Sequence, residues 1–183
     1  MILKTYDVTK IDYLVKPDEF SELTTESNAL DIFTDFKKTA PLYIEQSLDV
    51  LSAEDLMKKT HVKLQLVLYN GDFVGTLAYE DLIGEKIMAH YNHFNRREIP
   101  VSDVMIPRSN LRAINFNDVK KAKIKDIIET LRNEGRQHCL VIDEELHHIR
   151  GVFSASDIAR RLHIPIQIDK VSTFVDIYKA INE

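Results

Sequence analysis

The sequence predicts a mixed α/β fold (α+β) made of two tandem β-α-β-β-α modules that pack as a pair. Two observations favour this fold: an internal repeat that fills most of the chain, and a composition typical of globular proteins. Of the 183 residues, 44% are hydrophobic and 29% are charged, which argues against a disordered chain. A chain of this length holds one domain of ordinary size or two small modules that share a core.

The internal repeat is clearest around two glycines, Gly75 and Gly151. Each glycine is followed by an apolar stretch, and an aspartate lies six residues after the glycine: Asp81 in the first copy and Asp157 in the second. The two glycines are 76 residues apart, and so are the two aspartates. Several blocks that recur in the same order indicate two copies of one unit, with small insertions in loops. The other aligned blocks are residues 66–68 with 140–142, 74 apart, and residues 29–33 with 101–105, 72 apart.

Both copies show the same predicted order of elements. A short strand is followed by an amphipathic helix, as at Ile124, Ile127, Ile128 and Leu131, whose spacing places them on one helical face. Two buried strands and a last helix follow, and Asn70-Gly71 is a strong hairpin signal. The predicted ranges are strands 41–44 and 111–116, helices 52–59 and 124–133, buried strands 64–69 and 139–143, and closing helices from about residues 79 and 156.

The repeat divides the chain into five predicted segments. A unit of about 60 residues buries little apolar surface alone, so the two units are expected to share a core. The polar connection that ends in a proline is expected to be exposed. The segments are an N-terminal arm (1–28), a first module (29–91), a linker (92–100), a second module (101–164) and a C-terminal tail (165–183).

The tail contains a predicted amphipathic helix. Phe174, Ile177, Tyr178 and Ile181 fall at helical spacing, and Ser172 or Thr173 is placed to cap the helix. Such an apolar stripe has to be buried. Two places remain open for the burial of this stripe: the protein's own core and a dimer contact.

Composition narrows the classes of function and location. The net charge of −5 argues against a general nucleic-acid binder, which needs Lys and Arg to neutralise phosphates. No apolar run approaches the roughly 18 residues that span a bilayer, so we expect no membrane insertion. The N-terminus lacks the apolar stretch of a signal peptide, and the single cysteine, Cys139, suits a reducing compartment. We expect a cytoplasmic protein.

Catalytic motifs are missing from the sequence. It contains no nucleophile elbow, P-loop, GxGxxG or zinc-hydrolase motif. The seven histidines show no metal-ligand spacing. Because the repeat occupies most of the chain, we expect a protein that is not an enzyme and requires neither a metal nor a cofactor.

The second copy resembles the CBS domain family, named after cystathionine β-synthase. Residues 101–105 (VSDVM) are similar to the family's opening signature, and residues 140–143 (LVID) to its buried strand. Residues 151–158 (GVFSASDI) are similar to its pattern of glycine, apolar pair, Ser or Thr, two variable residues, Asp and an apolar residue. The resemblance covers residues 29–164, so the chain resembles a stand-alone bacterial CBS pair.

This resemblance implies a ligand and a set of binding residues. CBS pairs often dimerise, and their clefts bind adenosine ligands such as AMP, ADP, ATP or S-adenosylmethionine. Asp157 would then bind the ribose hydroxyls, and Ser154 the ribose or the α-phosphate. Met105, Ile106, Pro107 and Leu111 would line the base pocket. Further candidates are Ser156 and Asp81, with Arg108, Arg136, His138 and Arg160 as possible cations.

The chemistry of these residues also suits a nucleotide on general grounds. A carboxylate accepts hydrogen bonds from both hydroxyls of a cis-diol, and a hydroxyl at a helix start lies beside free N–H groups that favour an anion. The first copy differs, because Ala78 stands where Ser154 stands in the second, although Asp81 is retained. Its cleft is therefore expected to be either empty or specific for a different nucleotide.

Other interpretations remain open. Ser154 and Asp157 are spaced as a capping box, which satisfies N–H groups at a helix start without any ligand. Three functions compete: a homodimeric nucleotide sensor that regulates an unknown protein, an interaction scaffold with degenerate clefts, and an enzyme with a site built from the flanking segments. Nucleotide bound to protein purified from cells would separate the first from the second.

Overall fold

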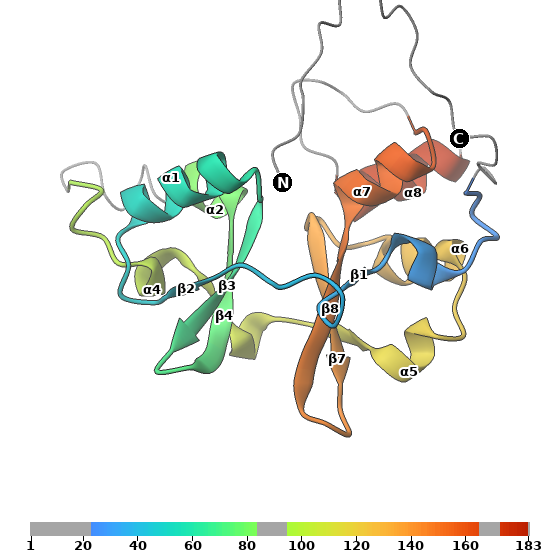
Figure 1. The fold of residues 1–183 in the computed structure, drawn as a ribbon. Helices are drawn as coiled ribbons and strands as arrows, with labels where there is room; N and C mark the ends of the chain where they lie inside the picture. The colour runs from blue at the N-terminus through green and yellow to red at the C-terminus, as the bar shows by residue number, and fades with distance from the viewer. Residues whose placement is uncertain (1–22, 84–94, 165–172, 183) are drawn as a thin grey trace, which may run out of the picture.

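A computed structural model describes residues 23–83, 95–164 and 173–182. It contains two four-stranded sheets flanked by helices, which confirms the mixed α/β fold of two modules (Figure 1). Most of the predicted arm, the first part of the linker and Ser172 lie outside the described residues. Within those residues, no helix is long and apolar enough to cross a membrane.

The first sheet has the strand order β2-β3-β4-β5. β2 (Tyr43–Glu45) runs parallel to β3 (Leu64–Tyr69), and α1 (Val50–Thr60) connects them. β3 pairs antiparallel with β4 (Asp72–Ala78), and α2 (Tyr79–Ile83) follows. The predicted hairpin at Asn70-Gly71 is confirmed, and both residues have positive φ angles, as its tight turn requires.

The second sheet has the order β1-β8-β7-β6 and repeats this plan. β6 (Ala113–Asn115) runs parallel to β7 (His138–Asp143), which pairs antiparallel with β8 (His148–Ser154). The helices of this module are α5 (Phe116–Val119), α6 (Ile124–Leu131), α7 (Ala155–Arg161) and α8 (Phe174–Asn182).

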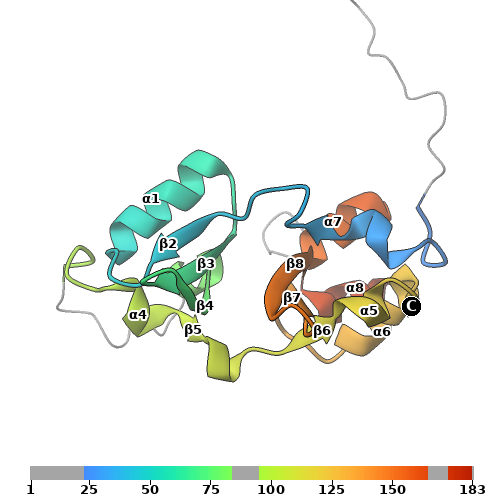
Figure 2. The ribbon, with the colours of Figure 1, turned by 60° about the horizontal axis from the view of Figure 1, so that its bottom comes forward.

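Each sheet takes its fourth strand from the segment that opens the other repeat. β1 (Thr34–Asp35) opens the first repeat but pairs antiparallel with β8. β5 (Ile106–Pro107) opens the second repeat but pairs antiparallel with β4. Figure 2 shows the chain crossing between the modules twice, between β1 and β2 and between β5 and β6. Three short helical turns flank these strands: η1 (Ala29–Ile32), α4 (Val101–Val104) and η2 (Arg108–Asn110).

The two hydrophobic cores follow this exchange rather than the order of the repeats. Ala29 and Ile32 are buried in the core of the second sheet, whereas Ile99 and Val101 are buried in the core of the first. The segment that opens the first repeat, at residue 29, therefore packs in the core of the second module, and the segment that opens the second repeat, at residue 101, packs in the core of the first.

Part of the linker is buried, although the sequence analysis expected it to be exposed. Ile99 is 2% exposed. Arg96 forms an ion pair of 2.6 Å with the buried carboxylate of Glu54 and donates a hydrogen bond of 3.2 Å to the carbonyl oxygen of Leu82. A buried carboxylate needs such a partner, so Arg96 ties the linker to α1 and to the end of α2.

The glycine at the centre of each repeat makes the strand exchange possible. A Cβ atom added to Gly151 would overlap the carbonyl oxygen of Thr34 and the ring of Phe33, and one added to Gly75 would overlap the carbonyl oxygen of Ile106. Only glycine, which has no side chain, lets the backbone of a neighbouring strand approach this closely. The repeated glycine is thus explained by the crossing strands β1 and β5.

A buried ion pair also holds β1 in place. Arg150 Nη2 donates to Asp35 Oδ2 at 2.9 Å, and the guanidinium group lies 4.3 Å from the ring centroid of Phe116. Phe33 lies beside the same ring and beside Phe153, with centroids 5.8 and 5.3 Å apart. The pair joins residues 115 positions apart, so it favours the exchanged arrangement only once the fold has formed.

The apolar stripe of α8 is covered by the protein's own core. Phe174 is 0% exposed and Ile177 is 1% exposed, and both belong to the core of the second module. The predicted cap at Thr173 is confirmed, because Asp176 N–H donates to Thr173 Oγ1 at 3.4 Å and Thr173 N–H donates to Asp176 Oδ2 at 2.8 Å. The C-terminal helix therefore stabilises the second module.

Gly151→Ala is expected to destabilise the protein by about 1 to 3 kcal/mol, because the added methyl group forces β1 away from β8. Gly135→Ala is the matched control, since an added Cβ there meets no atom within 4 Å, and it should stay within about 1 kcal/mol of wild type. Urea unfolding midpoints measure both. Equal midpoints for the two variants would contradict the close approach at Gly151.

Candidate functional site

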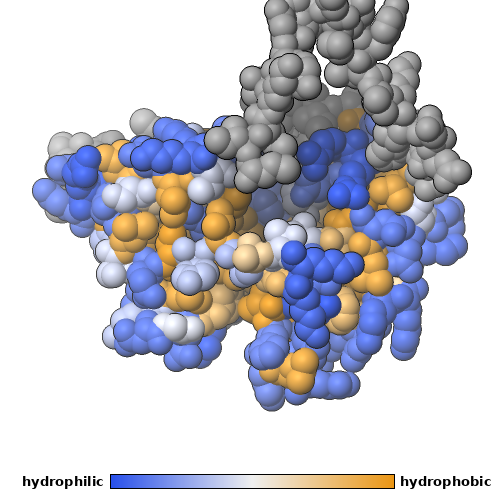
Figure 3. All heavy atoms as spheres, viewed as in Figure 1, coloured by the Kyte–Doolittle hydropathy of each residue, from blue (hydrophilic) through white to orange (hydrophobic). Residues whose placement is uncertain are grey.

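Two pockets lie between the modules, where the faces of the two sheets that carry no helices meet. We name them the Asp157 pocket, about 370 Å³, and the Glu80 pocket, about 250 Å³. Leu64 and His138, which occupy equivalent positions in the two repeats, line both pockets. Figure 3 shows apolar side chains along the middle of the molecule, between the modules. The pockets are therefore related by the internal repeat.

The Asp157 pocket combines an apolar wall with a few polar groups, as small-molecule sites do. Its polar side chains come from both modules: Ser154 ends β8, Ser156 and Asp157 lie in α7 (Ala155–Arg161), Lys63 precedes β3, and Thr34 lies in β1. The other polar residues of the lining are Thr39, His61 and His138. The apolar part of the lining consists of Phe36, Ala40, Pro41, Leu42, Val62, Leu64, Leu66 and Val152.

Ser154 caps helix α7, as the capping-box interpretation expects, but Asp157 does not complete the box. Asp157 N–H donates to Ser154 Oγ at 3.4 Å. The Asp157 carboxylate instead accepts a bond of 2.7 Å from Arg160 Nη2 through Oδ1, and its side chain is 37% exposed. An exposed ion pair of this kind contributes little stability, so a ligand can compete for the carboxylate.

The equivalent aspartate of the first copy has a structural role. Ala78 N–H donates to Asp81 Oδ2 at 2.8 Å, so Asp81 satisfies a backbone N–H at the start of α2. Asp81 does not line either pocket. The two aspartates therefore occupy equivalent positions in the repeat, yet only the one in the second copy lines one of these two pockets.

The opening loop of the second copy lies away from Asp157, which corrects the grouping expected from the sequence. Ile106 and Leu111 line the Glu80 pocket, Met105 packs against the first core, and Pro107 pairs with Gly75. The exposed Arg108 lines neither pocket. The strand exchange causes this, because it places residues 34–42 of the first repeat, not residues 105–111, opposite Asp157.

The candidate cations divide between the pockets. Arg136 lines the Glu80 pocket and His138 lines both, while Arg160 reaches Asp157 from α7. Lys63 was missed by the sequence reasoning. It precedes a buried strand and carries no motif, and only the facing of the two sheets brings it to Ser154 and Asp157.

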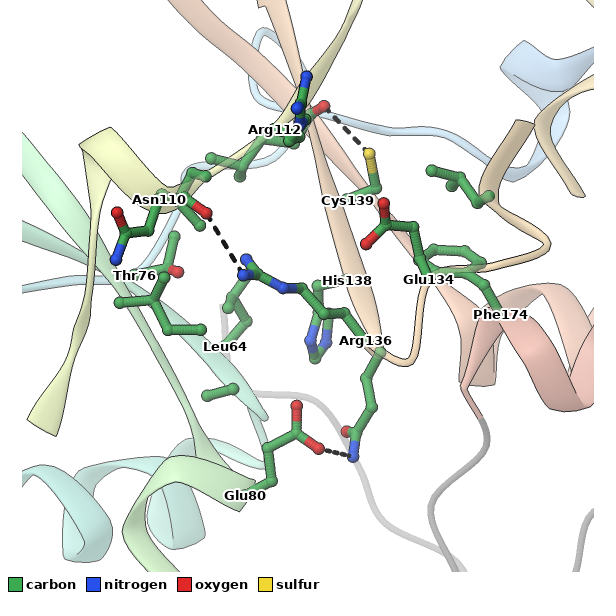
Figure 4. Close-up of a pocket in the computed structure, with 16 residues that line it drawn as sticks. Leu64, Thr76, Glu80, Asn110, Arg112, Glu134, Arg136, His138, Cys139 and Phe174 are labelled. Carbon is green, nitrogen blue, oxygen red and sulfur yellow. Dashed lines mark hydrogen bonds between the residues drawn. The ribbon is translucent and has the colours of Figure 1, made fainter. Parts of the chain in front are cut away.

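The Glu80 pocket is crossed by two hydrogen bonds between the modules (Figure 4). Glu80 Oε2 accepts a bond of 2.5 Å from Gln137 Nε2, and Arg136 Nη2 donates to the carbonyl oxygen of Asn110 at 3.3 Å. Burial, followed by the nearby charge of Asp81, raises the pKa of Glu80. This pocket is smaller than the Asp157 pocket, and the carboxyl groups of Glu80 and Glu134 lie in its wall.

His138 lies at the boundary of the two pockets with its imidazole uncharged. Burial and the nearby Lys63 lower the pKa of His138 to about 4. Its neighbour Cys139 is buried, and burial raises the pKa of the thiol to about 12, so Cys139 behaves as a small apolar residue. Among the described residues, no group of three or more side chains could hold a metal ion.

Because the pKa of His138 falls from 6.5 to about 4 on folding, stability is present in full above pH 6.5 and is lost as pH falls towards 4. The loss attributable to this residue should approach about 3 kcal/mol. His138→Leu, which copies Leu64 of the first repeat, should lack that loss, whereas His148→Gln on the exposed hairpin should retain it. Urea unfolding at pH 7, 5.5 and 4 measures this, and an unchanged pH slope in His138→Leu would contradict it.

Comparison with known proteins identifies the module that carries Asp157. The family model described as the CBS domain matches residues 101–164. No curated protein matches the chain.

Solved structures with the same fold cover most of the chain. An uncharacterized conserved protein from Pyrococcus horikoshii is 20% identical with a TM-score of 0.58, over 79% of this chain and 98% of that one. CBSX2 in complex with AMP, a CBS-pair protein from Arabidopsis thaliana, is 17% identical with a TM-score of 0.52, over 73% and 94% of the two chains.

A third structure is the CBS domain of a bacterial CNNM/CorC family Mg²⁺ transporter in complex with ATP. It is 14% identical with a TM-score of 0.55, over 78% of this chain and 91% of that one. At these identities the likeness establishes the fold. The chain therefore contains a CBS domain at residues 101–164 and has the fold of a tandem CBS-domain protein.

Proposed function

We propose that this protein is a regulatory CBS pair whose Asp157 pocket binds an adenosine nucleotide, AMP, ADP or ATP. The observation that carries the proposal is the position of the Asp157 carboxylate at an apolar cavity that also holds two serines and a lysine. The structural neighbours solved with AMP and with ATP support this ligand class. We propose that the nucleotide signal acts on an unidentified partner protein in the cytoplasm.

Each part of a nucleotide has a suitable wall in the pocket. The apolar residues Pro41, Leu42 and Val152 suit the faces of a base, and Asp157 accepts hydrogen bonds from ribose hydroxyls. Lys63 favours a ligand that carries phosphate. A nucleotide therefore fits this pocket better than S-adenosylmethionine, which is cationic at its sulfonium group.

The scaffold function is a second candidate, favoured by the Glu80 pocket. Two hydrogen bonds already join the modules there without any ligand. If the protein is only a scaffold, calorimetric titration with millimolar AMP, ADP, ATP and S-adenosylmethionine should show no binding to either pocket.

Asp157→Ala is expected to weaken AMP binding by about 100-fold, because a charged acceptor for both ribose hydroxyls is lost. Asp157→Asn should lose less, since it keeps one acceptor oxygen. Asp81→Ala is the matched control: it removes the equivalent aspartate, which caps α2, and should change AMP affinity by less than about threefold. Calorimetric titration with AMP measures all four proteins.

The same titrations with 2′-deoxy-AMP complete a double-mutant cycle. The deoxy ligand should bind wild type more weakly and lose less on Asp157→Ala. If both ligands lose affinity equally, the carboxylate does not bind the 2′-hydroxyl, and the ribose assignment is wrong.

We further propose that the protein is a homodimer, as the family resemblance implies. The apolar stripe of α8 is covered within one chain, so α8 is not expected to form the dimer contact. Sedimentation at micromolar concentration should give about twice the mass of 21.2 kDa. A mass of one chain would exclude a strong dimer.

A further inference from the structure

The two pockets share one scaffold but differ at several equivalent positions of their linings, and three of these differences make the Glu80 pocket less favourable for an anion. Ser154 and Ser156 of the Asp157 pocket correspond to Ala78 and Glu80, 76 residues earlier. Lys63 corresponds to Gln137, 74 residues later. Two hydroxyls and a cation in one pocket are thus replaced by a methyl group, a carboxylate and an amide in the other.

Each of these three differences makes the Glu80 pocket bind an anionic ligand less favourably than the Asp157 pocket. The Asp157 pocket offers hydroxyls and an ammonium group, which stabilise phosphate oxygens. In the Glu80 pocket the carboxylate occupies the position of the Ser156 hydroxyl, and like charges at close range in a partly buried site repel strongly.

Glu80 is also held in place rather than free to turn into solvent. It is half-buried at the start of α2, and its Oε2 accepts the bond of 2.5 Å from Gln137 Nε2 across the module boundary (Figure 4). Burial and the nearby charge of Asp81 raise the pKa of Glu80, whereas the hydrogen bond from Gln137 and the charge of Arg136 lower it. Gln137, the equivalent of Lys63, is thereby engaged and presents no cation.

Arg112 and Arg136 also line the Glu80 pocket, at the positions where the Asp157 pocket has Leu42 and Val62, and are the groups that would oppose this effect. Arg136 reaches across the pocket to the carbonyl oxygen of Asn110 at 3.3 Å. That bond places the guanidinium group on the η2 side of the pocket, while Glu80 lies at its other end, bonded to Gln137 (Figure 4).

We propose that Glu80 is a specificity-determining residue that excludes phosphate-bearing nucleotides from its pocket, so that each chain binds one nucleotide, in the Asp157 pocket. This inference rests on the proposed nucleotide-binding function and adds to it a stoichiometry and a residue that sets it. The two modules therefore form one pocket that binds a nucleotide and one pocket that excludes it.

The test is the number of AMP molecules bound per chain, measured by calorimetric titration and checked by equilibrium dialysis with radiolabelled AMP. Wild type should bind one. The variant that combines Ala78→Ser, Glu80→Ser and Gln137→Lys gives the Glu80 pocket the hydroxyls and the cation of the Asp157 pocket, but no carboxylate equivalent to Asp157. It should bind a second AMP about 100-fold more weakly than the first. The reciprocal control, Ser156→Glu, should weaken AMP at the Asp157 pocket by about 100-fold or more, the loss expected when an anion faces a charged group of the same sign. Melting temperatures confirm that each variant is folded.

The outcomes separate this inference from the proposed function. Two AMP molecules bound to wild type would overturn the exclusion by Glu80, and a return to one in Arg136→Gln would show that the arginine carries the second phosphate. A folded triple variant that still binds one AMP, or an unchanged affinity in Ser156→Glu, would also overturn it. No binding to wild type or to the triple variant would overturn the proposed function itself.

Discussion

A glycine stands at each point where a strand from one repeat crosses onto the sheet of the other, and the ligand clefts depend on these two close approaches. With a side chain at residue 151, β1 could not reach β8, because the carbonyl oxygen of Thr34 and the ring of Phe33 occupy that space. Asp35 would then not meet Arg150, and residues 34–42 would not form the wall opposite Asp157. Backbone sterics at a single position therefore decide where a pocket forms.

The exchange gives both pockets the same construction from two modules, yet side-chain chemistry makes them different. Helix α2 begins with Asp81 bound to a backbone N–H, whereas helix α7 begins with Ser154 as the cap, which leaves the Asp157 carboxylate beside a cavity. Both helices are thus capped, and only the aspartate of the second copy lines one of the two pockets, where we propose that it binds the ligand. A duplicated unit can keep its fold with one cap and use the other aspartate for recognition.

Elements set by local patterns were predictable from the sequence, and contacts between distant segments were not. The hairpin at Asn70-Gly71 and helix α6 follow from turn chemistry and apolar spacing. β1 and β5 have two residues each and no local signal, so their exchange was missed and the opening loop was assigned to the cleft of Asp157. Lys63 and Glu80 gain their roles only when the two sheets face each other.

A crystal structure of the protein grown with AMP tests most directly whether the exchanged segments build the ligand site. The account predicts one nucleotide per chain, with its ribose at Asp157 and its base against residues 40–42 of the other repeat. AMP bound in the Glu80 pocket, or bound near Asp157 without contact to residues 34–42, would contradict the account.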